Sequence, residues 1–76
     1  MEYIKKYTYN ILYKKLFGKN VRFISDCQFF PNFDVTIKIN KIYYGANNEI
    51  LFEGKTSKNK KLTIGSNMKN LQFEII

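Results

Sequence analysis

Residues 35–44 read VTIKINKIYY, and this stretch decides the class of fold. Apolar side chains alternate with polar ones up to position 40, which is the period of a strand with one buried face. The alternation then breaks, because Lys41 stands where the next inward residue should be, and Ile42 and Tyr44 become the apolar positions. One extra residue near Asn40 and Lys41 would restore the register and bend the strand. The stretch therefore predicts a long strand interrupted by a β-bulge.

Shorter strand-like stretches lie on both sides of this segment. Further strands are predicted at residues 21–25, 50–53, 61–64 and 71–76. The Gly, Asn and Ser content of the intervening stretches predicts a turn at residues 45–48, a basic loop at residues 54–60 and a short 3₁₀ turn within residues 65–70. In the last strand, Leu71, Phe73 and Ile75 are predicted to face inward because they alternate.

The segment at residues 25–34 is predicted to form a loop or the lip of a barrel. Pro31 cannot pair in a central strand, and it keeps Phe30 extended. Phe29, Phe30 and Phe33 crowd around this proline. The three rings either cap the open end of the barrel or stand out as anchors for a partner. A core this small favours the capping role, while an exposed pair would favour binding.

The first 17 residues predict a helix. An apolar stripe with helical spacing is formed by Tyr9, Leu12, Tyr13, Leu16 and Phe17. Thr8 stands where a cap would begin the helix, and Gly18 suits the left-handed residue after its end. A strand is the alternative, since tyrosines also alternate here. If the helix begins near Tyr3, then Ile4, Tyr7 and Ile11 form a second apolar stripe.

The predicted elements add up to a single mainly β (α+β) domain over residues 1–76. An N-terminal helix over residues 1–17 precedes a small five-stranded antiparallel barrel over residues 18–76, whose closure would remove unpaired edges. This order of elements resembles that of SH3-like and Sm-like small barrels. The resemblance implies an architecture and no particular function, because such folds host many functions. The paired Trp residues of peptide-binding SH3 domains have no counterpart in a chain without Trp.

The composition argues against a membrane or secreted protein. There is no apolar run of about 18 residues, so no transmembrane helix is expected. The N-terminus lacks the apolar region of a secretory signal. Cys27 is the single cysteine. It allows no intramolecular disulfide and is expected to be a small buried side chain. We therefore expect a cytoplasmic protein without a membrane partner.

The residue types also argue against catalysis. The chain contains no His, which removes the usual general base and the commonest metal ligand. Gly54-Lys55-Thr56 matches only the end of a phosphate-loop pattern, and it precedes a strand instead of opening a helix. We therefore expect no enzyme, no catalytic residue, no metal site and no cofactor.

The net charge of +7 raises the question of a nucleic-acid partner. A basic surface with one aromatic side chain is predicted from Lys38, Lys41, Tyr43, Lys55, Lys58, Lys60 and Lys61. Such a surface could hold phosphates and stack a base. An ordinary solvated face is the alternative, because every basic residue except Arg22 is Lys, whose codons are A/T-rich. Phosphate recognition favours Arg.

A protein partner is the leading hypothesis. Apolar side chains in excess of one core's needs are predicted to dock on a larger protein or complex: Ile4, Tyr7, Ile11, Phe29, Phe30 and Phe33. A second copy of the chain is another candidate partner. A short basic chain of A/T-rich composition also fits a phage or mobile-element inhibitor of a host nucleic-acid-handling or defence system. Direct nucleic-acid binding is the alternative, and a small anionic ligand such as a nucleotide at the barrel rim is a third hypothesis.

Overall fold

The computed structural model describes the backbone of residues 1–27 and 30–76, and it describes side chains outside residues 27–31. In chain order the elements are β1 (Glu2–Tyr3), the 3₁₀ turn η1 (Ile4–Lys6), α1 (Tyr9–Leu16), β2 (Asn20–Cys27), β3 (Phe30–Tyr44), the 3₁₀ turn η2 (Ala46–Asn48), β4 (Ile50–Lys55), β5 (Lys61–Gly65) and β6 (Gln72–Ile75). The mainly β class is confirmed.

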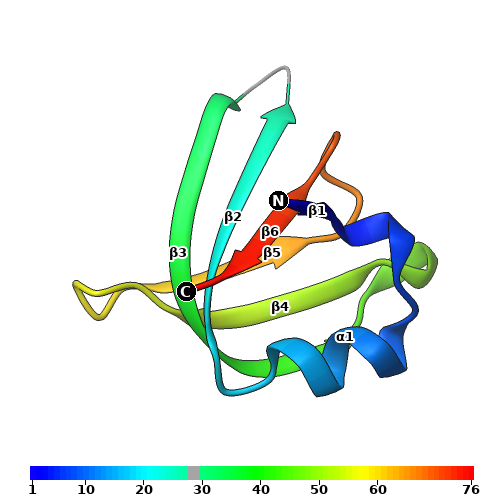
Figure 1. The fold of residues 1–76 in the computed structure, drawn as a ribbon, viewed down its shortest axis with the longest axis horizontal. Coiled ribbons are helices and arrows are strands. Elements are labelled where there is room, and N and C mark those ends of the chain that lie inside the picture. The colour runs from blue at the N-terminus through cyan, green and yellow to red at the C-terminus, as the bar shows by residue number, and fades with distance from the viewer. Residues whose placement is uncertain (28–29) are drawn as a thin grey trace.

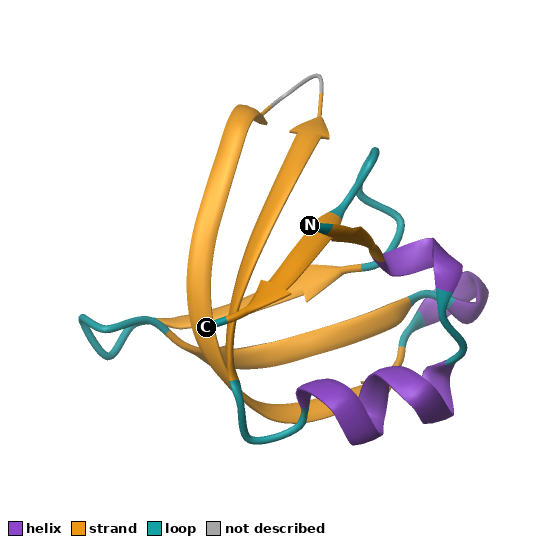
Figure 2. Ribbon diagram, in the orientation of Figure 1, coloured by secondary structure: helices purple, strands orange, loops and turns teal. Residues whose placement is uncertain are grey.

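The described strands form one antiparallel sheet in the order β1-β6-β2-β3-β4-β5 (Figures 1 and 2). The sheet has six strands where five were predicted, because Glu2 and Tyr3 pair with Phe73 and Gln72 of β6. The described pairings leave β1 and β5 at the two edges, so the sheet is not closed as the barrel prediction required.

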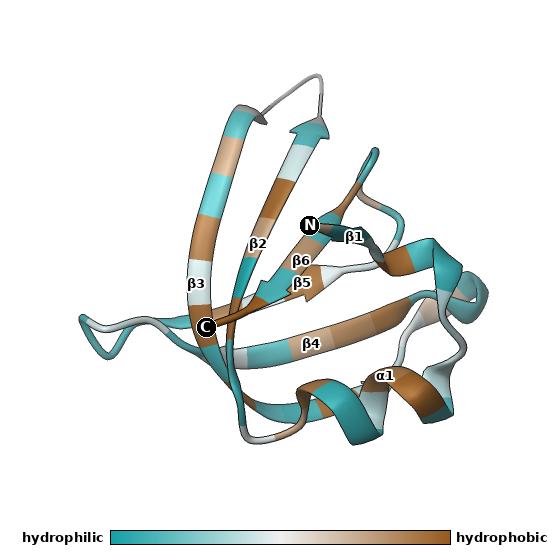
Figure 3. Cartoon of the chain, in the orientation of Figure 1, coloured by the Kyte–Doolittle hydropathy of each residue, from teal (hydrophilic) through white to brown (hydrophobic). Residues whose placement is uncertain are grey.

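The predicted bulge is confirmed in the middle of β3. Ile39 lies opposite Gly54 of β4 and Lys41 lies opposite Glu53, which leaves Asn40 as the extra residue. Ile39 and Ile42 are both buried, because the bulge returns the apolar positions to the inner face. Figure 3 shows the alternating bands of apolar and polar residues along the first part of β3, before the bulge.

The N-terminal segment differs from the predicted helix over residues 1–17, since α1 occupies only Tyr9–Leu16. Residues before it bond to the end of the sheet: the backbone N–H of Ile4 donates to the carbonyl of Leu71 at 3.0 Å. Those tertiary bonds replace the local ones that a longer helix would make. Thr8 is the N-cap, without a side-chain hydrogen bond, and Gly18 has the predicted left-handed conformation with φ 77°.

The core lies between the sheet and one face of α1. Its buried apolar residues are Ile4, Leu12, Leu16, Val21, Phe23, Ile37, Ile39, Ile42, Phe52, Ile64, Leu71 and Phe73. The rings of Phe23 and Phe52 meet at its centre with centroids 5.4 Å apart. Figure 1 shows α1 alongside the end of β3. The helices in the described part of the chain are not long and apolar enough to cross a bilayer.

The predicted loop at residues 25–34 is wrong, since β2 continues to Cys27 and β3 begins at Phe30. Pro31 is tolerated inside β3 because β3 pairs with β4 only from Lys38 onward. The first part of β3 therefore has a single strand neighbour, and proline is accepted where a strand edge is free. Phe29 lies outside the described residues, and the side chains of Cys27 and Phe30 are likewise not described.

Two smaller predictions about the C-terminal half need correction. β4 extends through Gly54 and Lys55, which were placed in a loop. The turn before β6 is not a 3₁₀ helix but two hydrogen-bonded turns, closed by bonds from Met68 to Gly65 and from Leu71 to Met68. Ile75 lies opposite the buried Val21 yet is 46% exposed, because β6 ends there and no further element covers it.

Candidate functional site

One flank of α1 carries a row of aromatic rings. Tyr9, Tyr13 and Phe17 follow one another at intervals of four residues, which places them on one side of the helix. Tyr44, from the end of β3, stacks on Tyr9 with centroids 4.6 Å apart, and Tyr13 stacks on Phe17 at 4.9 Å. Tyr9 and Tyr13 join the two pairs at 6.1 Å. We call these four residues the aromatic row.

Most of the aromatic row is open to solvent. Tyr44 is 58% exposed, Phe17 43% and Tyr13 40%. The sequence placed Tyr13 and Phe17 in the same stripe as Leu12 and Leu16, but only the two leucines are fully buried. Stacked rings stabilise one another by about 0.5–1.5 kcal/mol per pair, so part of this arrangement serves the fold. The outward surface of these rings remains open to solvent.

The row is anchored at its centre. The Tyr9 hydroxyl donates to the backbone carbonyl of Ile42 at 2.8 Å, which ties α1 to β3. Tyr9 and Tyr13 line a shallow depression of about 470 Å³ together with Asn10 and Lys14. This lining contains one cation and no carboxylate, so the depression is apolar with a positive border.

The predicted protein-binding residues from the N-terminal segment do not form one surface. Ile4 is 1% exposed and belongs to the core, so its prediction as a protein-binding residue is wrong. Tyr7 is half-buried, with its ring edge 5.8 Å from Phe73. The Tyr7 hydroxyl donates to the Glu2 carboxylate, and that bond raises the pKa of Tyr7. Ile11 is 46% exposed on the other flank of α1 from the aromatic row.

The phenylalanine cluster is described only at Phe33. Its side chain is half-buried and packs against the core. The positions of Phe29 and of the Phe30 side chain fall outside the described residues, so their predicted role stays a prediction.

The predicted basic surface is brought together on the outer face of β3, β4 and β5. Lys38 lies directly opposite Lys55, and Lys55 lies directly opposite Lys61. Residues paired in this way point to the same side of a sheet, and like charges there destabilise it. The exposed Lys58 and Lys60 follow in the adjoining loop. We call these five lysines, with Lys41 and Tyr43, the basic face.

Contacts within the basic face offset part of its charge. The Lys61 ammonium lies 3.6 Å from a Glu53 carboxylate oxygen. The Lys41 ammonium lies 4.8 Å from the centre of the Tyr43 ring, which is half-buried, so one face of this ring is already covered by a cation. Tyr43 is therefore less free to stack a base than the sequence suggested.

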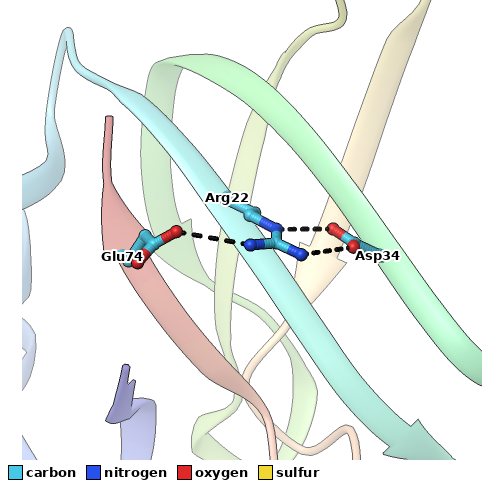
Figure 4. A network of polar contacts seen from close by, with 3 residues as sticks. All are labelled: Arg22, Asp34 and Glu74. Atoms are coloured by element: carbon cyan, nitrogen blue, oxygen red, sulfur yellow. Dashed lines mark hydrogen bonds and ion pairs between the residues drawn. The ribbon is translucent and has the colours of Figure 1, made fainter.

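Arg22 is engaged elsewhere in the sheet (Figure 4). Its guanidinium donates two hydrogen bonds to Asp34, at 2.9 and 2.7 Å, and a longer one of 3.4 Å to Glu74. The hydrogen bonds from Arg22 hold the pKa of Asp34 below its ordinary value. The single arginine thus joins β2 to β3 and β6, and the cations of the basic face are all lysines.

The acidic and serine side chains are candidates for a site in the described part of the chain. This part contains no group of three or more His, Cys, Asp or Glu side chains that could hold a metal ion. The two buried serines have structural bonds: Ser25 donates to the Lys69 carbonyl at 2.7 Å, and Ser66 accepts from the backbone N–H of Ile50 at 2.9 Å.

Comparisons of the chain with protein families, characterised proteins and solved structures give no match. The geometry offers two surfaces, the aromatic row and the basic face. Sequence reasoning found the second and missed the first. The signal for the row was the four-residue spacing of its helical rings beside Asn10 and Lys14, which also suits a core-facing stripe.

Proposed function

We propose that this chain is a non-catalytic binding protein that docks on a larger protein through the aromatic row. The observation that carries the proposal is the exposure of Tyr13, Phe17 and Tyr44, between 40% and 58%, on and beside a helix that is anchored to the sheet. Aromatic anchors dominate the binding energy of protein interfaces. Rings already stacked on each other lose little conformational freedom on binding, which favours affinity.

The charge of the chain indicates the chemistry of the partner. The net charge is +7, and Lys14 lies beside the row. A partner with an acidic surface around an apolar groove would be attracted and oriented by this charge. A second copy of the chain would carry the same charge and be repelled. The proposed occupant is therefore an acidic protein, and a homodimer is the competing outcome of the test.

The double substitution Tyr13→Ser with Tyr44→Ser tests the aromatic row. The tagged chain is used to capture a partner, and the purified partner is then titrated against wild type and variants by biolayer interferometry. We expect the double variant to lose about 30-fold or more in affinity, the scale of an interface hot spot. Ile11→Ser, on the opposite flank of α1, is the matched control and should change affinity by no more than about threefold.

Two results would contradict the docking proposal. One is a partner that binds the folded double variant as tightly as wild type. The other is a wild-type dimer in analytical ultracentrifugation that the double variant abolishes, since this would assign the row to a second copy. Circular dichroism of each variant establishes that it is folded before affinities are compared.

We further propose that the fold is an open relative of the SH3-like and Sm-like small barrels. The helix before β2, the bulge in β3 and the single core between the sheet and α1 support this assignment. We propose a cytoplasmic location, because the single Cys27 permits no intramolecular disulfide. A phage or mobile-element inhibitor that blocks a host complex is the biological role this small, basic, non-catalytic protein fits.

A second candidate function is nucleic-acid binding along the basic face. The specific observation is the cross-strand alignment of Lys38, Lys55 and Lys61, which costs stability and which phosphates would relieve. The absence of arginine from this face and the covered ring of Tyr43 place it second.

Fluorescence anisotropy with labelled mixed-sequence RNA and single-stranded DNA tests this candidate. If it holds, binding persists near physiological salt, and the triple variant Lys38→Gln, Lys55→Gln, Lys61→Gln flattens the log–log salt slope by about two, or about 0.7 per phosphate contact. The matched control is Lys14→Gln, Lys15→Gln, Lys19→Gln, which removes the same charge from exposed positions outside the basic face. If the two variants lost the same amount of affinity, the binding would depend on net charge alone, and this result would refute a defined site.

A further inference from the structure

A pocket of about 430 Å³ lies between the N-terminal segment and the turn before β6. Its lining residues are Tyr3, Lys5, Lys6, Lys69, Asn70 and Leu71. The volume lies within the range of small-molecule sites. Half of the lining residues are lysines and none is acidic, while the wall itself is mostly apolar, so the pocket suits a ligand that has both an apolar part and an anionic part.

The two walls of the pocket are held together by backbone bonds between distant parts of the chain. Tyr3 pairs with Gln72 at the edge of the sheet, and the N–H of Ile4 bonds to the Leu71 carbonyl at 3.0 Å. The Lys69 carbonyl accepts two bonds, from the Ser25 hydroxyl at 2.7 Å and from the Asp26 N–H at 3.2 Å. Leu71 is buried beneath these residues. The pocket is thus formed before any ligand arrives, which lowers the cost of binding.

Tyr3 differs from the other tyrosines of the chain. Contacts with another ring or with a lysine occupy Tyr7, Tyr9, Tyr13, Tyr43 and Tyr44. Within the described structure Tyr3 has no such contact, and it is 46% exposed. Close to half of the Tyr3 surface is therefore open to a planar ligand, and stacking of a base on an aromatic ring is worth about 1–3 kcal/mol.

The pocket lysines are also uncommitted. The ion pairs of the described residues involve only Arg22 and Lys61 as cations. Lys5, Lys6 and Lys69 therefore have no carboxylate partner in that part of the chain. Ammonium groups bind phosphate oxygens through strong charge-assisted hydrogen bonds. The three ammonium groups beside this pocket carry more positive charge than a ligand with a single carboxylate would neutralise.

We propose that this pocket binds a nucleoside polyphosphate, with the base against Tyr3 and the phosphates toward Lys5, Lys6 and Lys69. The combination of a free ring and three free cations matches the two chemically distinct halves of this ligand. The same chemistry occurs in a free nucleoside triphosphate and at the triphosphorylated 5′ end of an RNA. The site is separate from the aromatic row, so it goes beyond the docking function proposed above.

Isothermal titration calorimetry with ATP and with inorganic tripolyphosphate tests the proposal. We expect wild type to bind ATP at least about tenfold more tightly than tripolyphosphate, because only ATP gains the stacking contact. Tyr3→Ala should remove this difference and leave tripolyphosphate binding unchanged, while Tyr3→Phe should preserve it. The triple variant Lys5→Gln, Lys6→Gln, Lys69→Gln should lose at least about tenfold for both ligands.

The matched control is the triple variant Lys14→Gln, Lys15→Gln, Lys19→Gln, which has the same net charge, lies outside both the pocket and the basic face, and should bind ATP as wild type does. Equal loss in the two triple variants, or equal affinity of wild type for ATP and tripolyphosphate, would overturn the proposal. An RNA with a 5′ triphosphate that binds at least tenfold more tightly than ATP, and than the same RNA with a 5′ hydroxyl, would assign the site to RNA ends. The folded Tyr13→Ser, Tyr44→Ser variant should keep ATP binding, which separates this test from the docking proposal.

Discussion

Replacing Gly54 by alanine is expected to lower the free energy of unfolding by about 3 kcal/mol. A Cβ at this position would collide with the carbonyl oxygen of Lys38, lie 2.8 Å from its carbonyl carbon and lie 3.1 Å from the Cα of Ile39. These are backbone atoms of β3 next to its bulge, so they cannot rotate away as a side chain would. A domain of this size is stable by about 4–11 kcal/mol, so the loss is a large fraction of the total. Urea unfolding followed by circular dichroism measures it.

Gly65→Ala is the matched control for Gly54. Its Cβ would meet the Glu49 side chain, with the carboxyl carbon at 2.8 Å, and no backbone atom is among its three nearest contacts. That carboxylate can move, at the cost of its hydrogen bond to the Asn67 N–H. We expect a loss of about 1 kcal/mol or less, the net worth of one such bond. Equal stability of the two variants would show that β4 does not approach β3 as closely as the bulge requires.

Ile4→Ala is expected to lower the free energy of unfolding by about 3 kcal/mol, within the range measured for buried isoleucines. Ile4 is 1% exposed, and its backbone N–H is bonded to Leu71, so the truncated side chain would leave a cavity that this tethered segment cannot close. Thermal and urea unfolding of the purified variant give the change.

Ile11→Ala provides the comparison, because it makes the same truncation on a side chain that is 46% exposed. It should change stability by no more than about 0.5 kcal/mol, since surface substitutions in helices rarely do more. An Ile4→Ala variant as stable as wild type that has lost partner binding would return Ile4 to the binding surface. Together the two variants separate residues that the sequence placed in one stripe.

The bulge shows what local pattern can predict. Its position near Asn40 followed from a change of parity, because the side chains of a strand alternate with a period of two and any extra residue is visible in the order of residues alone. The close approach that makes Gly54 necessary did not follow, since it depends on where the bulge lies against β4. A glycine beside a lysine and a threonine was instead interpreted as part of a loop.

Some of the candidate binding residues could likewise be predicted from the sequence, whereas others required the tertiary structure. The cross-strand alignment of Lys38, Lys55 and Lys61 follows once consecutive strands are paired as hairpins. The basic face could therefore be predicted from the sequence. The pocket beside Tyr3 was not, because its walls come from the two ends of the chain and are joined by the pairing of β1 with β6.

The sequence by itself determined the mainly β class, the bulged strand, the helix over Tyr9–Leu16 and the inward direction of Leu71 and Phe73, all through local periodicity. Only the tertiary structure decided that Ile4 is core while Tyr13 and Phe17 remain exposed. The physical reason is that periodicity gives the direction of a side chain relative to its own element, whereas exposure depends on what covers that direction. The sheet is wide enough to cover Leu12 and Leu16 but leaves the flank of α1 uncovered, and that flank is the proposed binding site.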